Sequence, residues 1–188
     1  MKKVLLFLSM ALLAVSCGTA IQITDANREI NNFVYNNGSV TWSKVYEFNA
    51  ADMNAVKDWF QSSFKITKET EKSIIGETNS NSLPIQEVGY SRMSVIMILT
   101  HPCVVYFTTD FKEDRYRVTV NRIIWSPQVG ITTYGVTQGV GTMDLNEIAV
   151  QNGGYKSAFY NTTSVQLDKM LTYMFTPRLN KASNDDNW

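Results

Sequence analysis

Two β-rich runs around a polar turn dominate the middle of the chain. Residues 104–125 read VVYFTTDFKEDRYRVTVNRIIW, with the turn Lys-Glu-Asp-Arg at 112–115. A hairpin in which Phe111 faces Tyr116 has one apolar face, because side chains alternate between the two faces of a strand. That face would carry Val105, Phe107, Thr109, Phe111, Tyr116, Val118 and Val120, with Arg122 near its open end.

The other face of the same hairpin is polar. It would carry Tyr106, Thr108, Asp110, Arg117, Thr119 and Asn121. In this register Asp110 lies opposite Arg117, and a cross-strand pair of opposite charge helps to fix the pairing. One apolar and one polar face are typical of an antiparallel sheet with helices on a single side. We therefore expect the rest of the chain to cover the apolar face.

The segment before this hairpin predicts a strand, a helix and two short strands. Residues 40–48 alternate between apolar and polar side chains, broken at Lys44. Asn49 or Asp52 can cap a following helix. The apolar side of this helix would consist of Met53, Val56, Trp59, Phe60 and Phe64. Residues 65–70 and 72–78 are β-rich, and Gly76 indicates a bulge or a close backbone approach.

The remaining elements are shorter or end the chain. Residues 93–99 are apolar and β-branched, but Pro102 follows, so we expect an edge strand or a bulge. Residues 133–137 allow a second hairpin, and residues 144–150 allow one helical turn, which Asn-Gly-Gly ends. The last helix has Thr163 and Gln166 at capping-box spacing and stops before Pro177. Its apolar stripe would be Leu167, Met170, Leu171 and Met174.

Together these elements predict an α+β domain of two layers, an antiparallel sheet with helices packed on one face, in the order β-α-β-β-β-β-α. Four stretches resemble a family of Bacteroidetes envelope lipoproteins: Lys44-Val45-Tyr46-Glu47-Phe48, Trp59-Phe60, Ile74-Ile75-Gly76 and Arg115-Tyr116-Arg117. That family is known as a domain of unknown function with a TATA-binding-protein-like (TBP-like) fold. The resemblance covers about residues 39–125 and the last helix; it implies this fold and brings no catalytic residues. The Lys-Glu-Asp-Arg turn and the Gly-rich stretch at 127–154 depart from the family pattern.

The first residues have the order of an export signal. Two lysines follow Met1, an apolar run covers residues 4–15, and the run ends in Ala14-Val15-Ser16-Cys17. This resembles the bacterial lipobox, which implies cleavage before Cys17 and acylation of that residue. The resemblance also implies the outer membrane, because Gly18 stands where an Asp would signal retention. We expect the periplasmic side, since no acidic run follows. The alternative is a plain secretory signal with a chance cysteine.

These observations divide the chain into four parts. Residues 1–16 form the signal peptide, and residues 17–38 form the lipidated cysteine with a polar tether rich in Asn, Thr and Asp. Residues 39–177 form a single α+β domain with a Gly-rich excursion at 127–154. Residues 178–188 form a polar tail.

Charge excludes one class of partner. Removal of the signal peptide with Lys2 and Lys3 leaves 15 basic and 17 acidic side chains, a net charge of −2. Nucleic-acid binding needs clustered Lys and Arg, and no expected strand or helix carries such a cluster. We therefore expect no nucleic acid. The expected partners are the membrane, through the anchor, and a protein of the envelope.

A catalytic or metal site is hard to build from this sequence. His101 and Cys103 are two residues apart and could form a Cys-His dyad. Pro102 distorts the strand between them, and no nearby Asn or Asp orients the imidazole. The neighbouring residues are apolar, so we expect a structural role with a raised thiol pKa. One His with one Cys does not make a zinc site, and no cofactor motif occurs.

We therefore expect a lipid-anchored, non-catalytic binding or assembly module of the cell envelope. The six polar hairpin residues Tyr106, Thr108, Asp110, Arg117, Thr119 and Asn121 are candidates for a recognition face, or are plain solvent-facing positions. One alternative is an enzyme acting on cell-wall or glycan substrates with carboxylates that the sequence does not locate. The other is a structural spacer.

Overall fold

The computed structural model describes residues 20–49, 52–126, 131–133, 136–138 and 141–178. Within these residues eight strands form one antiparallel sheet in the order β2-β3-β4-β8-β7-β6-β5, with β11 beside the end of β8. The strands are β2 (Glu29–Ile30), β3 (Phe33–Asn36), β4 (Ser39–Glu47), β5 (Lys65–Glu69), β6 (Ser73–Glu77), β7 (Cys103–Lys112), β8 (Arg115–Trp125) and β11 (Met143–Asp144). The predicted hairpin is present as β7–β8, and it lies at the centre of the sheet.

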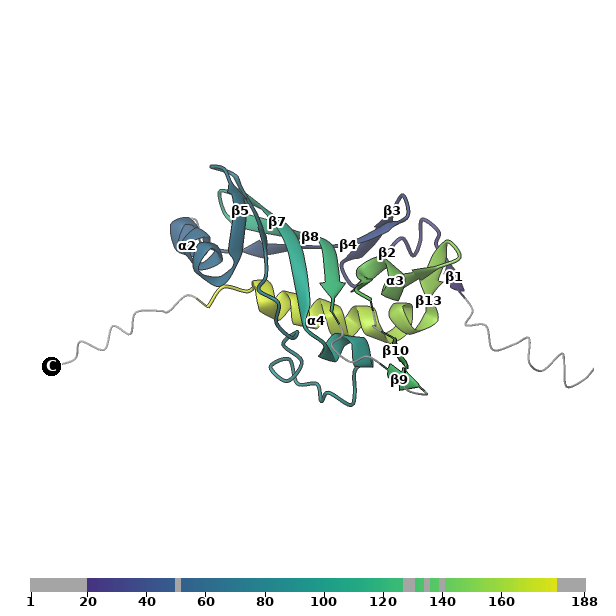
Figure 1. Cartoon of the computed structure of the whole chain (residues 1–188). Helices are drawn as coiled ribbons and strands as arrows, with labels where there is room; N and C mark the ends of the chain where they lie inside the picture. The colour runs from purple at the N-terminus through teal and green to yellow at the C-terminus, as the bar shows by residue number, and fades with distance from the viewer. Residues whose placement is uncertain (1–19, 50–51, 127–130, 134–135, 139–140, 179–188) are drawn as a thin grey trace, which may run out of the picture.

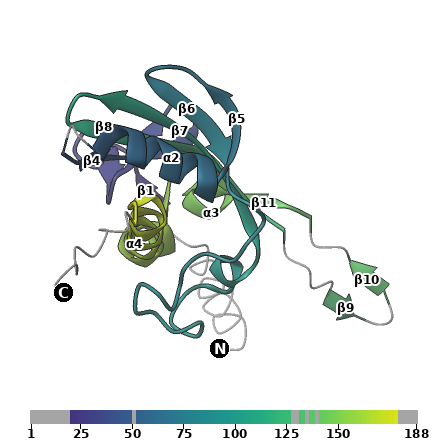
Figure 2. The same cartoon turned by 90° about the vertical axis from the view of Figure 1, so that its left-hand side faces the viewer.

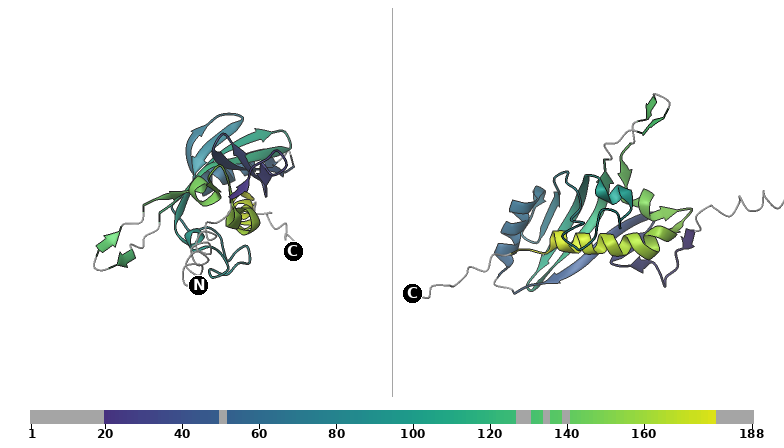
Figure 3. Two further views of the ribbon diagram at one scale, coloured as in Figure 1. Left: turned by 90° about the vertical axis from the view of Figure 1, so that its right-hand side faces the viewer. Right: turned by 90° about the horizontal axis from the view of Figure 1, so that it is seen from below.

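The described helices lie on one face of this sheet (Figure 1). They are α2 (Met53–Ser63), α3 (Leu145–Ala149) and α4 (Ser164–Phe175). Phe60 of α2 and Phe175 of α4 both pack on Phe107 of β7, with ring centroids 5.9 and 5.0 Å away. Seen from below, α4 crosses the strands (Figure 3). The predicted α+β architecture of two layers, with helices on one side, is confirmed.

The predicted hairpin register is confirmed near the turn and wrong at the open end. Phe111 pairs with Tyr116 and Asp110 with Arg117. Phe107 pairs with Val120 but Tyr106 pairs with Arg122, so Asn121 is an extra residue in a β-bulge. A bulge reverses the side-chain alternation beyond it. Arg122 is therefore exposed rather than on the apolar face, and Ile123 and Trp125 are buried instead.

The prediction of a polar tether at 17–38 is wrong for residues 20–38, and the domain does not begin at residue 39. β1 (Ala20–Gln22) pairs with β13 (Gly154–Lys156), and β3 pairs with β4. Phe33 of β3 is completely buried. Asn31, Asn32 and Asn37 have positive φ angles of 47°, 64° and 49°. Asn tolerates this conformation, so the residues that resemble a linker make tight turns between strands.

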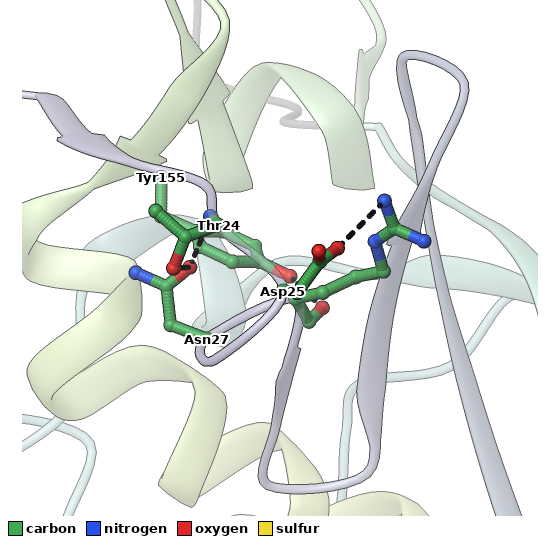
Figure 4. A network of polar contacts seen from close by, with 5 residues as sticks. Thr24, Asp25, Asn27 and Tyr155 are labelled. Carbon is green, nitrogen blue, oxygen red and sulfur yellow. Dashed lines mark hydrogen bonds and ion pairs between the residues drawn. The ribbon is translucent and has the colours of Figure 1, made fainter.

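Polar contacts fasten the turn after β1 to the rest of the domain (Figure 4). The Thr24 amide donates to Asn27 Oδ1 at 2.7 Å, and Arg28 forms an ion pair with Asp25 at 3.3 Å. The hydroxyl of Tyr155, from β13, donates to the Arg28 carbonyl oxygen at 2.9 Å. Tyr155 is buried, so this segment is joined to the core rather than extended into solvent.

The stretch predicted as a Gly-rich excursion, 127–154, has two different parts. β9 (Ile131–Thr133) pairs with β10 (Val136–Gln138), which confirms the predicted hairpin, while residues 127–130, 134–135 and 139–140 lie outside the described residues. Beyond residue 141 the chain joins the core. Asp144 and Glu147 form a capping box at α3, and Leu145 and Ala149 are buried. β12 (Val150–Gln151) and β13 then form a turn at Asn152 and Gly153.

The prediction of a strand at 93–99 is wrong. Residues 83–101 form a loop that ends in a 3₁₀ turn at Met97–Thr100. Val95 and Leu99 are buried four residues apart, while Met93 and Met97 are exposed. The chain thus has no strand-like alternation here, and Pro102 removes a donor that a strand would need. In place of the expected edge strand, the chain forms a loop with two exposed methionines, Met93 and Met97.

The predicted capping box at Thr163 is also wrong, because the last helix begins earlier. Residues 159–163 form a π-helical segment that continues into α4, and Thr163 has a helical φ of −65°. Phe159 is buried and packs edge-on against Phe33, with ring centroids 5.2 Å apart. This packing outweighs the low helix propensity of Asn-Thr-Thr at 161–163. The helix ends at Phe175, before Pro177, as predicted.

Candidate functional site

The sheet face opposite the helices carries all six residues of the predicted recognition face. No helix in the described part of the chain packs on it, and Figure 2 shows the helices together on the other side. We call this surface the open sheet face and add three neighbours from β4 and β6. It consists of Ser43, Val45, Ile75, Tyr106, Thr108, Asp110, Arg117, Thr119 and Asn121.

Hydroxyl groups form a row across β7, β8 and β4, and Ile75 of β6 lies at the end of this row. Ile75 of β6 pairs with Thr108, Thr108 with Thr119, and Thr119 with Ser43 of β4. The Thr119 and Ser43 hydroxyls are 3.3 Å apart, and Asn121 Nδ2 donates to Thr108 Oγ1 at 3.3 Å. Asn121 keeps the alternation of Arg117 and Thr119, so its amide lies on this face as predicted. The row is flat and offers both donors and acceptors.

A second row places charge beside an apolar side chain. Arg117 Nη2 lies 3.3 Å from Asp110 Oδ2, as the register predicts, and Val45 is the cross-strand neighbour of Arg117 on β4. Both charged side chains are about half exposed. An exposed pair of this kind contributes less than about 1 kcal/mol to stability, so both charges remain available to a partner.

Sequence reasoning missed the apolar members of the open sheet face. Val45 is 52% exposed and Ile75 is 39% exposed. The alternation of β4 could have revealed Val45, because it places this residue on the other face of the strand from Trp42 and Tyr46. Lys44 interrupts that pattern on the helix side, and the structure explains it: its ammonium group donates to Thr172 Oγ1 of α4 at 2.8 Å.

His101 and Cys103 do not form a catalytic pair. Cys103 is 1% exposed, and its thiol donates to the Asn81 carbonyl oxygen at 3.7 Å. Burial raises the pKa of this thiol from 9.0 to about 12. In the described part of the chain no hydrogen bond joins the two side chains. The sequence-based expectation of a structural, unreactive thiol agrees with this environment.

Cys103 is therefore expected to react with a thiol reagent only after unfolding. With a pKa of about 12, its thiolate fraction at pH 8 is roughly a thousandfold lower than that of an exposed thiol. The full chain with Cys17→Ser leaves Cys103 as its one thiol. Ellman's reagent should then detect almost no thiol in buffer and one thiol per chain in guanidinium chloride. Rapid reaction of the folded chain would contradict the buried position.

Grooves also occur away from the open sheet face, and one of about 480 Å³ lies along α4 beside Lys44, Asp168 and Lys169. Another, of about 470 Å³, lies between α2, α4 and the loop after β6, and its charged lining residues are Glu87 and Arg178. A third, of about 840 Å³, has an acidic set and a basic set: Glu71, Glu113 and Asp114 with Lys57, Lys72, Lys112 and Arg115. Arg115 Nε donates a hydrogen bond to Asp114 Oδ1 at 2.7 Å, and this bond lowers the pKa of the Asp114 carboxyl group. A general acid needs a raised pKa, so this arrangement does not favour acid catalysis.

The described residues contain no candidate metal site and no candidate membrane-spanning helix. There, no three His, Cys, Asp or Glu side chains are placed to hold a metal ion together. No helix within the same ranges has the length and apolar character needed to span a bilayer. Cys17 and the predicted signal peptide lie outside these ranges.

The sheet and helices described above define an α+β protein with an open antiparallel sheet. No protein-family model and no curated protein matches the sequence. Among solved structures, the chain is similar to a TBP-like protein from Parabacteroides distasonis, with a TM-score of 0.41 and 12% identity over 74% of this chain and 86% of that one. It is also similar to a DUF4468 family protein from Bacteroides ovatus, with a TM-score of 0.43 and 11% identity over 85% of this chain and 99% of that one.

Proposed function

We propose that this protein is a lipid-anchored binding module of the bacterial cell envelope and that the open sheet face binds a protein partner. The observation that carries the proposal is an uncovered face over the central strands β6, β7, β8 and β4 with exposed apolar side chains in it. Val45 and Ile75 are the exposed apolar residues.

A protein fits this surface better than a small molecule or a nucleic acid. A hollow of about 90 Å³ lies on the open sheet face between Val45, Asp110, Lys112, Arg115 and Arg117. It is much smaller than the roughly 300–1,000 Å³ of small-molecule pockets, so it would not enclose such a ligand. Asp110 and Arg117 pair with each other, and Arg122 beside Tyr106 adds one exposed cation. Phosphate binding needs clustered Lys and Arg, and this surface has no such cluster on its central strands. Apolar residues among hydroxyl and amide groups, with one ion pair, resemble the mixed composition of transient protein interfaces.

The envelope location rests on the N-terminal residues. A basic start, an apolar run and Ala14-Val15-Ser16-Cys17 support cleavage before Cys17 and acylation of that cysteine. Several acyl chains hold a protein on a membrane far more firmly than one. Gly18 supports the outer membrane, and the absence of an acidic run after it supports the periplasmic side.

The proposal is tested by crosslinking and pull-down from native envelopes. The intact chain is compared with Cys17→Ala, with Val45→Glu on the open sheet face, and with Asp58→Ala on the exposed side of α2 as a matched control. We expect one partner with the intact chain and with Asp58→Ala. Its recovery should fall about tenfold with Val45→Glu, because a charge is forced into an apolar contact. We expect its loss with Cys17→Ala.

Equal recovery with Val45→Glu would show that the open sheet face is not the binding surface. Equal recovery with Cys17→Ala would show that binding does not need the anchor. Val45 is 52% exposed, so its substitution should leave the fold intact, and a urea titration checks this.

A further inference from the structure

We propose that the domain lies directly on the membrane that holds its acyl anchor, with the side formed by the loop at 90–97 and the exposed surface of α4 against the lipid. This inference rests on the proposed acylation of Cys17. It adds a second interaction surface, whose partner is the lipid bilayer itself.

The first argument is the length of the link between anchor and domain. Gly18 and Thr19 are the residues between Cys17 and Ala20, where β1 begins. Ala20 pairs with Lys156 of β13. Three Cα-to-Cα steps span at most about 11 Å. The β1 end of the domain therefore stays within about one headgroup layer of the acyl chains.

The second argument is that the chain leads from the β1–β13 end of the domain into α4. Lys156 leads into the π-helical segment and then α4, whose outward side includes Val165 and Lys169. Gln166 Nε2 of α4 donates to the Ser94 carbonyl oxygen at 2.9 Å, so the loop at 90–97 lies against this helix. The loop lies below the sheet together with α4 in Figures 1 and 2.

The third argument is the chemistry of that surface. We call it the methionine face, and it consists of Arg92, Met93, Ile96, Met97, Val165 and Lys169. Met93 is 97% exposed, Met97 76%, and Ile96 and Val165 37% each. These are four of the six large hydrophobic residues that are exposed in the described part of the chain. Exposed apolar groups gathered in this way mark an interaction site.

Charge on the methionine face fits an anionic lipid surface. Arg92 and Lys169 are exposed cations, and residues 90–101 contain no acidic side chain. The one acidic residue of α4, Asp168, is partly buried, and its Oδ1 accepts from Asn32 and Trp42 within the domain. Cations beside apolar side chains are the composition of proteins that lie in the membrane interface. Flexible methionine side chains adapt to an irregular surface such as lipid headgroups.

The arrangement is also consistent with the binding role of the open sheet face. The methionine face lies on the helix side and the open sheet face lies on the opposite side of the same domain (Figure 2). A domain that rests on its helix side directs the open sheet face away from the lipid. Anchoring and partner binding would then use opposite surfaces.

The test measures how deep two positions lie in the membrane. The full chain is produced with its signal, purified with its lipid and placed in vesicles of phosphatidylethanolamine and phosphatidylglycerol. A fluorophore is attached through Met97→Cys or, as the matched control, through Val45→Cys. Cys103 is buried and should not be labelled. Lipids with spin-label quenchers near the headgroups should reduce fluorescence at position 97 by about half and leave position 45 unchanged.

A second variant checks that the apolar side chains cause the contact. Met93→Glu places a charge on an almost fully exposed residue, so the fold should persist. Combined with the label at position 97, it should abolish most of the quenching.

Two failures can be told apart by mass spectrometry of the Cys17 peptide. An acylated chain with equal quenching at positions 97 and 45 would overturn the docking inference and leave the anchor standing. Quenching at position 97 that persists in full with Met93→Glu would also overturn it. A chain without lipid on Cys17 would overturn both the anchor and the docking.

Discussion

Replacing Phe60 with alanine is expected to lower the free energy of unfolding by about 3–5 kcal/mol, the usual cost of removing a buried aromatic ring. Phe60 is completely buried on α2. Its ring centroid lies 5.6 Å from that of Tyr116, 5.9 Å from Phe107 and 6.4 Å from Phe175. The truncation therefore leaves a cavity at the point where α2, α4 and the central hairpin meet.

Urea unfolding of the full chain, followed by tryptophan fluorescence, measures this loss. Asp58→Ala changes the exposed side of the same helix and should shift the free energy of unfolding by less than about 0.5 kcal/mol. A loss below about 1 kcal/mol for Phe60→Ala would mean that the aromatic cluster is not the centre of the core.

Asp168→Ala is expected to lower the free energy of unfolding by about 2–4 kcal/mol, because two hydrogen bonds to a charged acceptor disappear together. Asp168 Oδ1 accepts from Asn32 Nδ2 at 2.7 Å and from Trp42 Nε1 at 2.9 Å. Trp42 is completely buried, so its indole N–H would lose its partner away from water. A buried donor without a partner is costlier than a hydrogen bond that was never formed.

Hydrogen exchange shows where the effect of Asp168→Ala lies. The amides of β2 and β3 should lose protection first, since Asn32 lies between these strands and contacts α4 through Asp168. The neighbouring Lys169→Ala, on the exposed side of α4, should leave those amides protected. Uniform loss of protection throughout the sheet would argue against a local role for Asp168.

The central hairpin could be predicted from sequence because its signals are local. Alternation fixes which residues face inward, and Asp110 opposite Arg117 selects the register. The bulge at Asn121 escaped prediction, because Ile123, Ile124 and Trp125 are apolar in succession and do not show which of them faces the core. In such a run, alternation fits equally well with Ile124 facing the core or with Ile123 and Trp125 facing it.

The role of residues 20–38 could not be predicted, because their partners are distant in sequence. Asn31 and Asn32 are typical of linkers when only neighbouring residues are considered. Their amides bond Ser164 and Asp168, which lie 133 and 136 residues further along the chain. No local pattern reveals such contacts.

The open sheet face was predictable and the methionine face was not. The polar residues from Tyr106 to Asn121 follow strand alternation, so their common face can be read from the sequence. Met93 to Met97 has the apolar composition of a strand, yet the structure forms a loop there and exposes both methionines. Composition alone cannot distinguish a buried strand from a loop in which Val95 and Leu99 are buried and both methionines are exposed.

The pairing of β1 with β13 sets the order in which the chain can fold. β1 finds its partner only when residues 154–156 are present, and Asn31 and Asn32 find theirs only when α4 has formed. Contacts of such long sequence separation close large loops and slow folding. The hairpins of β7 with β8 and of β3 with β4 can form early from neighbouring residues, whereas β1 must wait for residues near the end of the chain. The first strand of the domain is thus among the last elements to reach its native contacts.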